Sequence, residues 1–271
     1  MTCRVCPALA AAGVLVLLAL SSGCSREKNI VPTGILEGDK YLMERGNDLS
    51  AKKKWFQARE YYLQLVDNYP QSNYRPDAKL GLGDTYLGEK SSESLVMAQN
   101  EYREFLTFYP THPRADYAQF KLGMCHFQQM LAPDRDQTET KEAIAELTLF
   151  VQRYPQSGML EEGRGKLREA RNRLTESEYK VGYFYWRNKW YPGAIERFKA
   201  VLKNDPEYPK RDAVYYYLGD SMAKMGRRPE AVPYFDRLVK EFERSEFLAK
   251  AQAALKDVPE EPPALPVKKA G

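Results

Sequence analysis

The sequence has few of the side chains that metal, redox and catalytic sites require. Its 271 residues include two histidines, His112 and His126, and four cysteines. Surface and packing roles account for the two histidines, and no glycine-rich phosphate loop is present. An enzyme such as a wall hydrolase would need an acidic pair or a nucleophile–base pair converging in one cleft, and we find none. We therefore expect no enzymatic activity, no cofactor and no metal.

A dominant charge of one sign is also lacking. Basic residues number 41 and acidic residues 37, which gives a formal net charge of +4 spread along the chain. Since no basic stripe stands out, we expect no nucleic-acid partner. The mean hydropathy of −0.61 excludes a multispan membrane protein, and the hydrophobic share of 43% excludes a disordered chain.

Three of the four cysteines lie in the first 24 residues, inside a targeting segment. Arg4 precedes an apolar run from Ala8 to Leu20, whose 13 residues span roughly 20 Å as a helix, less than the roughly 30 Å core of a bilayer. A basic start, a short apolar core and small residues are typical of a cleaved secretory signal. The residues directly before Cys24 resemble the bacterial lipobox, although Ser21 stands where Leu, Val or Ile is usual.

We therefore predict a lipoprotein signal peptide at residues 1–23, acyl chains on Cys24 that anchor the chain in the membrane, and a flexible linker at 24–36. An ordinary cleaved signal is the alternative. Cys3 and Cys6 leave with the signal, and we expect Cys125 to have a packing role.

One spacing recurs five times in the rest of the chain. A glycine is followed by an alanine, a large apolar residue comes four residues after the alanine, and a proline comes eight residues later in the first four sets. This pattern predicts tetratricopeptide repeats, which are helix–turn–helix units of about 34 residues. The sets are Gly46, Ala58, Tyr62, Pro70; Gly83, Ala98, Tyr102, Pro110; Gly123, Ala143, Leu147, Pro155; Gly182, Ala194, Phe198, Pro206; and Gly219, Ala231, Phe235, with Glu243 in place of proline.

The repeats predict an all-α right-handed superhelix, because each hairpin leaves an apolar face that only a neighbouring hairpin covers. We place repeats 1–3 at 37–160, repeats 4–5 with a C-terminal capping helix at 161–256, and a disordered Pro-rich tail at 257–271. A second long helical stretch after the third repeat runs without a proline from Met159 to Trp186. The two insertions, at 90–96 and 131–140, are expected to be loops.

Two repeats have aromatic residues where first helices would line the inner wall of the array. One hypothesis is a groove for an extended or helical peptide with apolar anchors. The alternative is that these side chains pack against the long connecting helix as core. The residues are Tyr117, Phe120, Met124 and Phe127 in the third repeat, and Tyr179, Tyr183 and Trp186 in the fourth.

Three consecutive lysines, Lys52–Lys54, precede Trp55 in the turn of the first repeat. We interpret them as a solvated turn in preference to a phosphate or lipid site.

Several motifs together resemble the BamD (YfiO) family of outer-membrane assembly lipoproteins. They are the lipobox-like start, the Tyr-Pro-x-Ser links at 69–72 and 154–157, the stretch TFYPTHPRADY at 107–117, the insertion with Asp134-Arg135-Asp136, and the run Ala170–Leu174. The resemblance covers residues 24 to about 256.

The resemblance implies a scaffold subunit of the machinery that folds and inserts β-barrel proteins, on the periplasmic face of the outer membrane. The N-terminal repeats would receive C-terminal segments of unfolded barrel proteins, and the C-terminal repeats would dock on the periplasmic domains of BamA. Arg197 matches a family position and is a candidate BamA contact, and other accessory lipoproteins would join the complex. Ser25, which replaces the inner-membrane retention signal Asp, agrees with this location.

A periplasmic repeat adaptor that coordinates cell division or peptidoglycan synthesis is the alternative function, since such adaptors also use Tyr-Pro-x-Ser links. Depletion separates the two, because only an assembly subunit should lower the level of outer-membrane barrel proteins.

Overall fold

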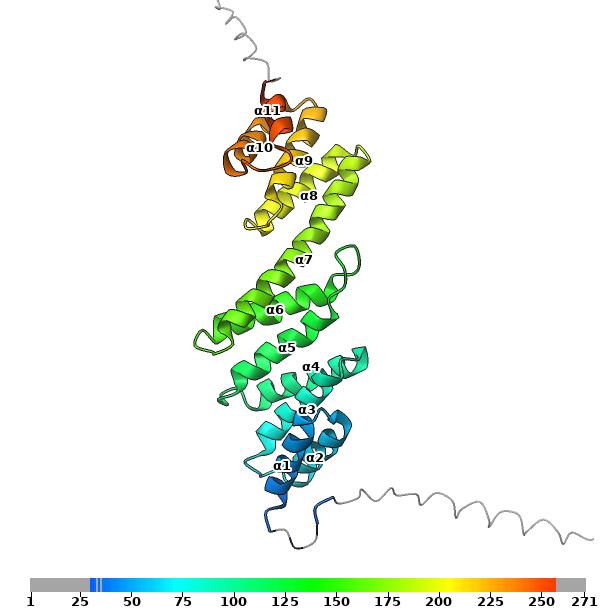
Figure 1. Cartoon of the computed structure of the whole chain (residues 1–271), viewed down its shortest axis with the longest axis vertical. Helices are drawn as coiled ribbons and strands as arrows, with labels where there is room; N and C mark the ends of the chain where they lie inside the picture. Colours follow the sequence, from blue (N-terminus) through cyan, green and yellow to red (C-terminus); the bar gives the residue numbers. More distant parts are fainter. Residues whose placement is uncertain (1–29, 33, 35, 257–271) are drawn as a thin grey trace, which may run out of the picture.

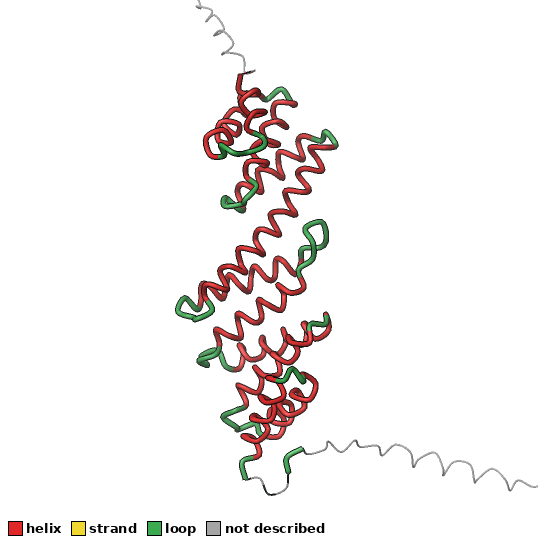
Figure 2. Tube along the Cα trace, in the orientation of Figure 1, coloured by secondary structure: helices red, strands yellow, loops and turns green. Residues whose placement is uncertain are grey.

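The computed structural model describes residues 30–32, 34 and 36–256, which form helices and connecting turns (Figures 1 and 2). The predicted signal peptide at 1–23, Cys24 and the predicted tail at 257–271 lie outside the described residues. None of the helices in the described part is long and apolar enough to cross a membrane. The helices are α1 (Gly38–Ala51), α2 (Trp55–Asn68), α3 (Arg75–Glu89), α4 (Ser92–Phe108), α5 (Ala115–Gln129), α6 (Thr138–Arg153), α7 (Leu160–Arg187), α8 (Tyr191–Asn204), α9 (Arg211–Lys224), α10 (Arg228–Glu241) and α11 (Leu248–Lys256).

The helices stack in chain order into an elongated array, with α1 and α2 at one end and α11 at the other (Figure 1). Contacts run mainly between helices that are neighbours in sequence, which is the behaviour expected of a repeat protein. The predicted all-helical tetratricopeptide array is confirmed. Helix α11 packs on α10 with Ala251 fully buried, as expected of the capping helix.

The repeat glycines allow the paired helices to approach closely. A Cβ atom on Gly46 of α1 would lie 2.5 Å from the Tyr62 ring, and one on Gly83 of α3 would lie 2.7 Å from the Tyr102 ring. Gly182 receives the ring of Phe198 in the same way, since a Cβ atom there would lie 2.8 Å from the ring. The aromatic ring therefore fills the space that the absent side chain leaves, which explains the glycine–aromatic pairing in the sequence.

Helix α7 has 28 residues and belongs to two hairpins at once. Its first half packs against α6, where Gly163 faces the ring of Phe150, and its second half packs against α8 through Gly182. The predicted continuous helix across residues 159–186 is confirmed. One rigid element thus joins the first three hairpins to the last two.

Two expected connections differ from the structure. The insertion at 90–96 is mostly helical, because the Ser91 side chain accepts a hydrogen bond from the backbone N–H of Ser94 and starts α4 at Ser92. The loop expected at 131–140 ends at Gln137, and α6 begins at Thr138.

The expected flexible linker is partly docked. The backbone N–H of Ile30 donates to Oε1 of Gln64 in α2 at 3.2 Å, and Ile30 and Val31 pack against the core of the first hairpin.

Candidate functional site

An aromatic cluster lies on the second half of α7 and the adjoining face of α9. The ring centroids of Trp186 and Tyr217 are 4.6 Å apart, and those of Tyr183 and Tyr217 are 5.2 Å apart. Tyr216 stacks on Phe247 at 4.8 Å, just before α11. The cluster, defined as Tyr179, Tyr183, Trp186, Tyr216, Tyr217 and Phe247, unites the three predicted groove residues of the fourth repeat with three from later elements. All except Phe247 are only partly buried, so the cluster presents ring surface to solvent.

Charged groups border this cluster on its C-terminal side. Trp186 donates its indole N–H to Asp220 at 2.6 Å, and the Lys224 ammonium lies 2.8 Å from the same carboxylate. That ammonium also sits 5.1 Å from the centroid of the Trp186 ring. The tryptophan is therefore held in place by both a hydrogen bond and a cation–π contact.

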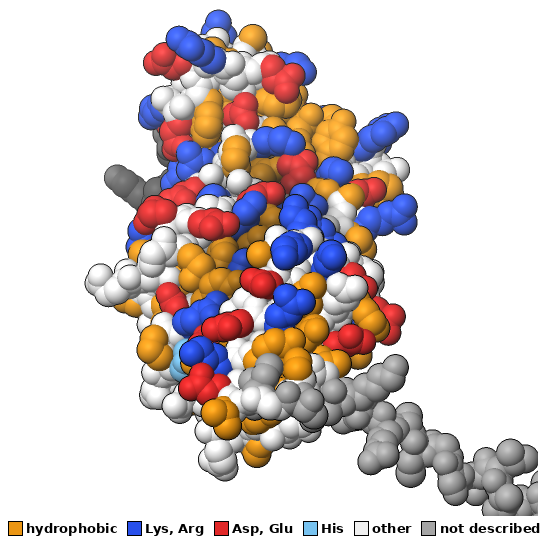
Figure 3. All heavy atoms as spheres, turned by 60° about the horizontal axis from the view of Figure 1, so that its bottom comes forward, with side chains coloured by type: hydrophobic (Ala, Val, Ile, Leu, Met, Phe, Trp, Pro, Cys, Tyr) orange, Lys and Arg blue, Asp and Glu red, His pale blue; other side chains and the backbone are white. Residues whose placement is uncertain are grey.

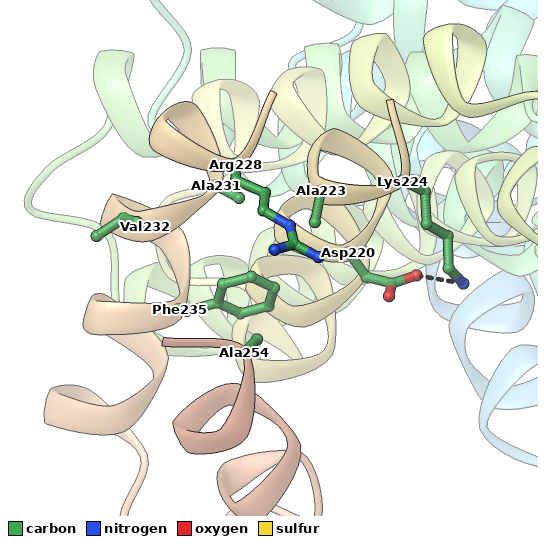
Figure 4. Close-up of a pocket in the computed structure, with 8 residues that line it drawn as sticks. All are labelled: Asp220, Ala223, Lys224, Arg228, Ala231, Val232, Phe235 and Ala254. Atoms are coloured by element: carbon green, nitrogen blue, oxygen red, sulfur yellow. Dashed lines mark ion pairs between the residues drawn. The ribbon is translucent and has the colours of Figure 1, made fainter. Parts of the chain in front are cut away.

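A pocket of about 320 Å³ opens beside these groups between α9, α10 and α11. Phe235, Val232 and three alanines form its apolar wall. Figure 4 shows Arg228 and Lys224 approaching Asp220 from opposite sides. Apolar walls with cations at the rim suit a peptide segment that carries both an apolar and an acidic group.

The predicted groove residues of the third repeat are placed differently. Phe120 is only 3% exposed and lies 5.4 Å from Phe150, so it is part of the core and does not line an open surface. Met124 and Phe127 are half-buried, and the Lys166 ammonium of α7 lies 4.6 Å from the centre of the Phe127 ring. The first half of α7 covers this group.

The two predicted groups form separate patches. Lys166, which borders the third-repeat group, and Tyr179, which begins the fourth-repeat group, are 13 residues apart on α7. At 1.5 Å per residue this separation is about 20 Å. A single continuous groove through all seven residues is therefore not what the structure presents.

Tyr117 belongs to a polar centre in the N-terminal repeats. Its hydroxyl donates to Asp84 at 2.7 Å, and the hydroxyl of Tyr102 donates to the same oxygen at 2.6 Å. Arg114 lies over the Tyr117 ring and donates to Asp77 at 2.9 Å. A hollow of about 220 Å³ adjoins Asp84 and Arg114. Asp84 directly follows the repeat glycine Gly83, as Met124 follows Gly123, so the sequence pattern places it at an inner-wall position. Its two tyrosine partners come from different helices, and no local signal joins them.

Asp84 is expected to destabilise the fold at neutral pH. Burial raises the pKa of its carboxyl, although the two tyrosine hydrogen bonds oppose this. The Asp84 carboxyl therefore holds its proton more tightly in the native state than in the unfolded chain. As the pH rises from the unfolded-state pKa, near 3.8, through the native-state pKa, the free energy of unfolding falls. Asp84→Asn keeps the acceptor oxygen and removes the charge.

We expect Asp84→Asn to raise the free energy of unfolding at neutral pH by about 1 kcal/mol. Urea denaturation at neutral and at mildly acidic pH measures the difference in the free energy of unfolding between the variant and the wild type. This difference should be smaller at acidic pH. An Asn variant that is less stable at neutral pH would contradict the expectation.

Arg197 lies on α8 and donates to Glu178 of α7 at 2.8 Å. Both side chains remain partly exposed, at 44% and 36%. Glu178 also lines a cleft of about 500 Å³ between α6, α7 and α8, whose floor includes Ile144, Leu174 and Val201. This cleft lies where α7 passes from one hairpin to the next, so the Arg197 pair marks the edge of the junction.

The far wall of the cleft is held by a buried acid. Asp205 is 5% exposed and accepts hydrogen bonds from Arg168 and, at 3.0 Å, from the Thr175 hydroxyl. Burial alone would raise the pKa of Asp205, but these two hydrogen bonds, the positive charge of Arg168 and a backbone hydrogen bond from Glu207 together outweigh it and lower the pKa. The ion pair fastens the α8–α9 connection to α7.

Metal-binding geometry is absent from the described part of the chain, where no three His, Cys, Asp or Glu side chains converge. Cys125 is free and fully buried, and burial raises the pKa of its thiol to about 12. Such a thiol is poorly nucleophilic.

The two histidines have structural partners. His126 is buried against Glu139 and Gln99, while His112 accepts a hydrogen bond from the backbone N–H of Arg114 in its turn.

Comparison with known proteins identifies relatives over most of this array. The model of the YfiO family, described as outer membrane lipoprotein, matches residues 38–228, and a tetratricopeptide repeat model matches 213–245. A curated relative from Caulobacter vibrioides, named outer membrane protein assembly factor BamD, is 28% identical over 83% of this chain and 73% of its own length. A relative of the same name from Vibrio cholerae is 26% identical over 71% of this chain and 82% of its own length.

Among solved structures, a crystal structure of MamA protein aligns with 84% of this chain and all of its own, at 20% identity and a TM-score of 0.34. The family match extends from the first helix to the start of α10 and so contains the Arg197 pair, the cleft, the polar centre and most of the aromatic cluster. The chain belongs to the YfiO family of outer membrane lipoproteins, whose curated members are named outer membrane protein assembly factor BamD.

Proposed function

We propose that this protein is a lipid-anchored periplasmic scaffold subunit of the machinery that assembles β-barrel proteins in the outer membrane. The family match over residues 38–228 carries the proposal, and the names of the relatives agree with it. Acyl chains on Cys24 would hold it at the periplasmic face, beside the other accessory lipoproteins of the complex. A scaffold role fits a helical array that presents a cleft between α6, α7 and α8 and a partly exposed aromatic cluster.

The junction around Arg197 is the proposed docking site for the periplasmic domains of BamA. The Arg197–Glu178 pair joins two helices and remains exposed, so an acidic residue of a partner can take the place of Glu178 without uncovering a buried charge. The neighbouring cleft offers an apolar floor for a side chain from the same partner. Apolar contact with a charged rim is the usual composition of a specific interface.

We place the site for C-terminal segments of unfolded barrel proteins at the aromatic cluster and the pocket beside it. This site lies in the fourth and fifth repeats, whereas the resemblance implies the N-terminal repeats, because Phe120 of the third repeat is core while the fourth-repeat residues are only partly buried. Tyr183 and Trp186 present stacked rings 5.6 Å apart, which suits contact with an aromatic terminal residue. Lys224 and Lys210 lie within cation–π distance of the cluster, and each pairs with one acid, Lys224 with Asp220 and Lys210 with Glu176. A terminal carboxylate would share or replace one of these acidic partners.

Reversal of charge at Arg197 tests the docking site. Affinity isolation of the Arg197→Glu protein from solubilised outer membranes should recover at least about tenfold less BamA than wild type, because the reversed charge repels an acidic partner. The control is Lys203→Glu, which makes the same change of charge on α8 but outside the Arg197–Glu178 pair. The amount of BamA recovered with this variant should equal the wild-type amount.

Barrel-protein levels provide the second measurement. Cells that carry only the Arg197→Glu variant should have lower levels of outer-membrane barrel proteins. Unchanged BamA recovery and unchanged barrel levels, with a defect in septation after depletion, would overturn the proposed function.

A further inference from the structure

The turn between α1 and α2 presents positive charge that no acidic side chain balances. Lys52, Lys53 and Lys54 are exposed, and none of them forms an ion pair with any residue that the structure describes. Phe56 follows in the first turn of α2 with 68% of its surface exposed. Figure 3 shows this end of the array, where hydrophobic, basic and acidic side chains lie beside one another on the surface. We call Lys52–Lys54 and Phe56 the basic turn.

The basic turn has a fixed geometry. The backbone N–H of Lys54 donates to the carbonyl of Leu49 at 2.9 Å, and that of Lys53 donates to Ser50 at 2.9 Å, which closes the end of α1. Trp55 packs against α3, where a Cβ on Gly88 would lie 2.7 Å from its ring. Because Trp55 points into the array, Phe56 and the lysines are held outward.

The N-terminal chain brings the lipid anchor within reach of this turn. Ile30 is fixed to Gln64 of α2 by its backbone N–H, and Cys24 is six positions before Ile30 in the chain. Six residues extend to at most about 20 Å. Gln64 and Trp55 are nine residues apart on α2, about 14 Å along the helix axis. Cys24 and the basic turn can therefore touch one plane at the same time.

The sequence alone favours a solvated turn here, but the exposed Phe56 and the docked Ile30 add an apolar contact and a short tether. We propose that the basic turn docks on the anionic phospholipid headgroups of the leaflet that holds the acyl chains of Cys24. This proposal rests on the acylation of Cys24 in the proposed function. The lysine ammoniums would contact lipid phosphates, and Phe56 would enter the interfacial region beside them. Three lysines bind a membrane weakly on their own, but a short tether raises their effective concentration at the surface. The first hairpin then rests on the membrane and the array extends away from it.

The test uses the processed protein, isolated from solubilised membranes and reconstituted in phosphatidylcholine vesicles, prepared with and without about one third phosphatidylglycerol. Gln57→Cys introduces an exposed thiol next to Phe56 for an environment-sensitive fluorophore, while the native Cys125 is buried and does not react. A lipid with a nitroxide on its headgroup quenches the fluorophore when the turn lies at the surface. We expect strong quenching only in vesicles that contain phosphatidylglycerol, and loss of quenching at high salt.

Substitution of Lys52, Lys53 and Lys54 by Gln should lower the ratio of docked to undocked protein on the order of 100-fold, since each lysine near an anionic surface contributes roughly fivefold. The matched control replaces three exposed lysines at the fourth hairpin, Lys189, Lys199 and Lys203, by Gln and should leave quenching unchanged.

Flotation with the vesicles separates failure of the anchor from failure of the docking. Protein that does not float with the vesicles would contradict the acylation of Cys24. Protein that floats but is quenched equally with and without phosphatidylglycerol, or equally in the lysine variant, would overturn the proposed docking. An unchanged circular dichroism spectrum confirms that the lysine variant is folded.

Discussion

Replacing Glu169 by proline is expected to lower the free energy of unfolding by about 3 kcal/mol or more and to uncouple the two ends of the array. Glu169 is the tenth of the 28 residues of α7, where its backbone N–H belongs to the continuous helix and its side chain is exposed. Proline removes that hydrogen bond and clashes with the preceding turn. Since α7 is the one element shared by the third and fourth hairpins, its break should let the two parts unfold separately.

Chemical denaturation followed by circular dichroism measures this effect. The Glu169→Pro protein should show two transitions, or one broad transition at lower denaturant. Glu169→Ala is the matched control, because the exposed ion pair with Lys166 that it removes contributes little, and its unfolding should stay within about 0.5 kcal/mol of wild type. A proline variant with a single sharp transition at the wild-type midpoint would show that α7 does not couple the two parts.

Phe120→Ser is expected to destabilise the fold by about 3–5 kcal/mol, the range of a large cavity in a core. Phe120 is 3% exposed and contacts Phe150, and it packs with Leu147 and Leu167, so the substitution leaves a void between α5, α6 and α7 and adds a buried hydroxyl. Urea denaturation should show a much lower midpoint. Any loss of peptide binding would then follow from unfolding.

Tyr183→Ser provides the contrast, because Tyr183 is partly exposed in the aromatic cluster. Its circular dichroism spectrum should remain helical while its binding of a peptide with a C-terminal aromatic residue weakens. If Phe120→Ser were folded with its stability intact and lost peptide binding, the third-repeat group would be a groove and not core.

Phe120 and Tyr183 show which parts of the fold and of the candidate site can be predicted from the sequence. The glycine–alanine–aromatic spacing locates the paired helices, because the close approach at Gly182 and Phe198 requires a small residue opposite a large one. Helical periodicity also places Phe120 and Tyr183 on corresponding faces. It cannot show that the first half of α7 covers Phe120 while the second half leaves Tyr183 partly open, because covering depends on how distant segments pack.

Local chemistry explains other differences. The residues at 90–96 are typical of a polar loop because serine and glutamate are common in loops, yet Ser91 is a helix cap and makes the same residues the start of α4. Asp84 is recognisable from the sequence as an inner-wall residue. Its role as the shared acceptor of Tyr102 and Tyr117 depends on contacts among three helices, and such contacts cannot be predicted from patterns in a single sequence.

Helix α7 also limits how the architecture can evolve. A hairpin can be duplicated or deleted in most repeat proteins, since each unit supplies both helices of its own pair. Here α6 and α8 pack on opposite halves of one 28-residue helix, so recombination at this junction would remove a packing neighbour from one of them. Gain or loss of repeats is therefore confined to positions away from α7, and the spacing between the sites on its two sides is fixed by the length of a single helix.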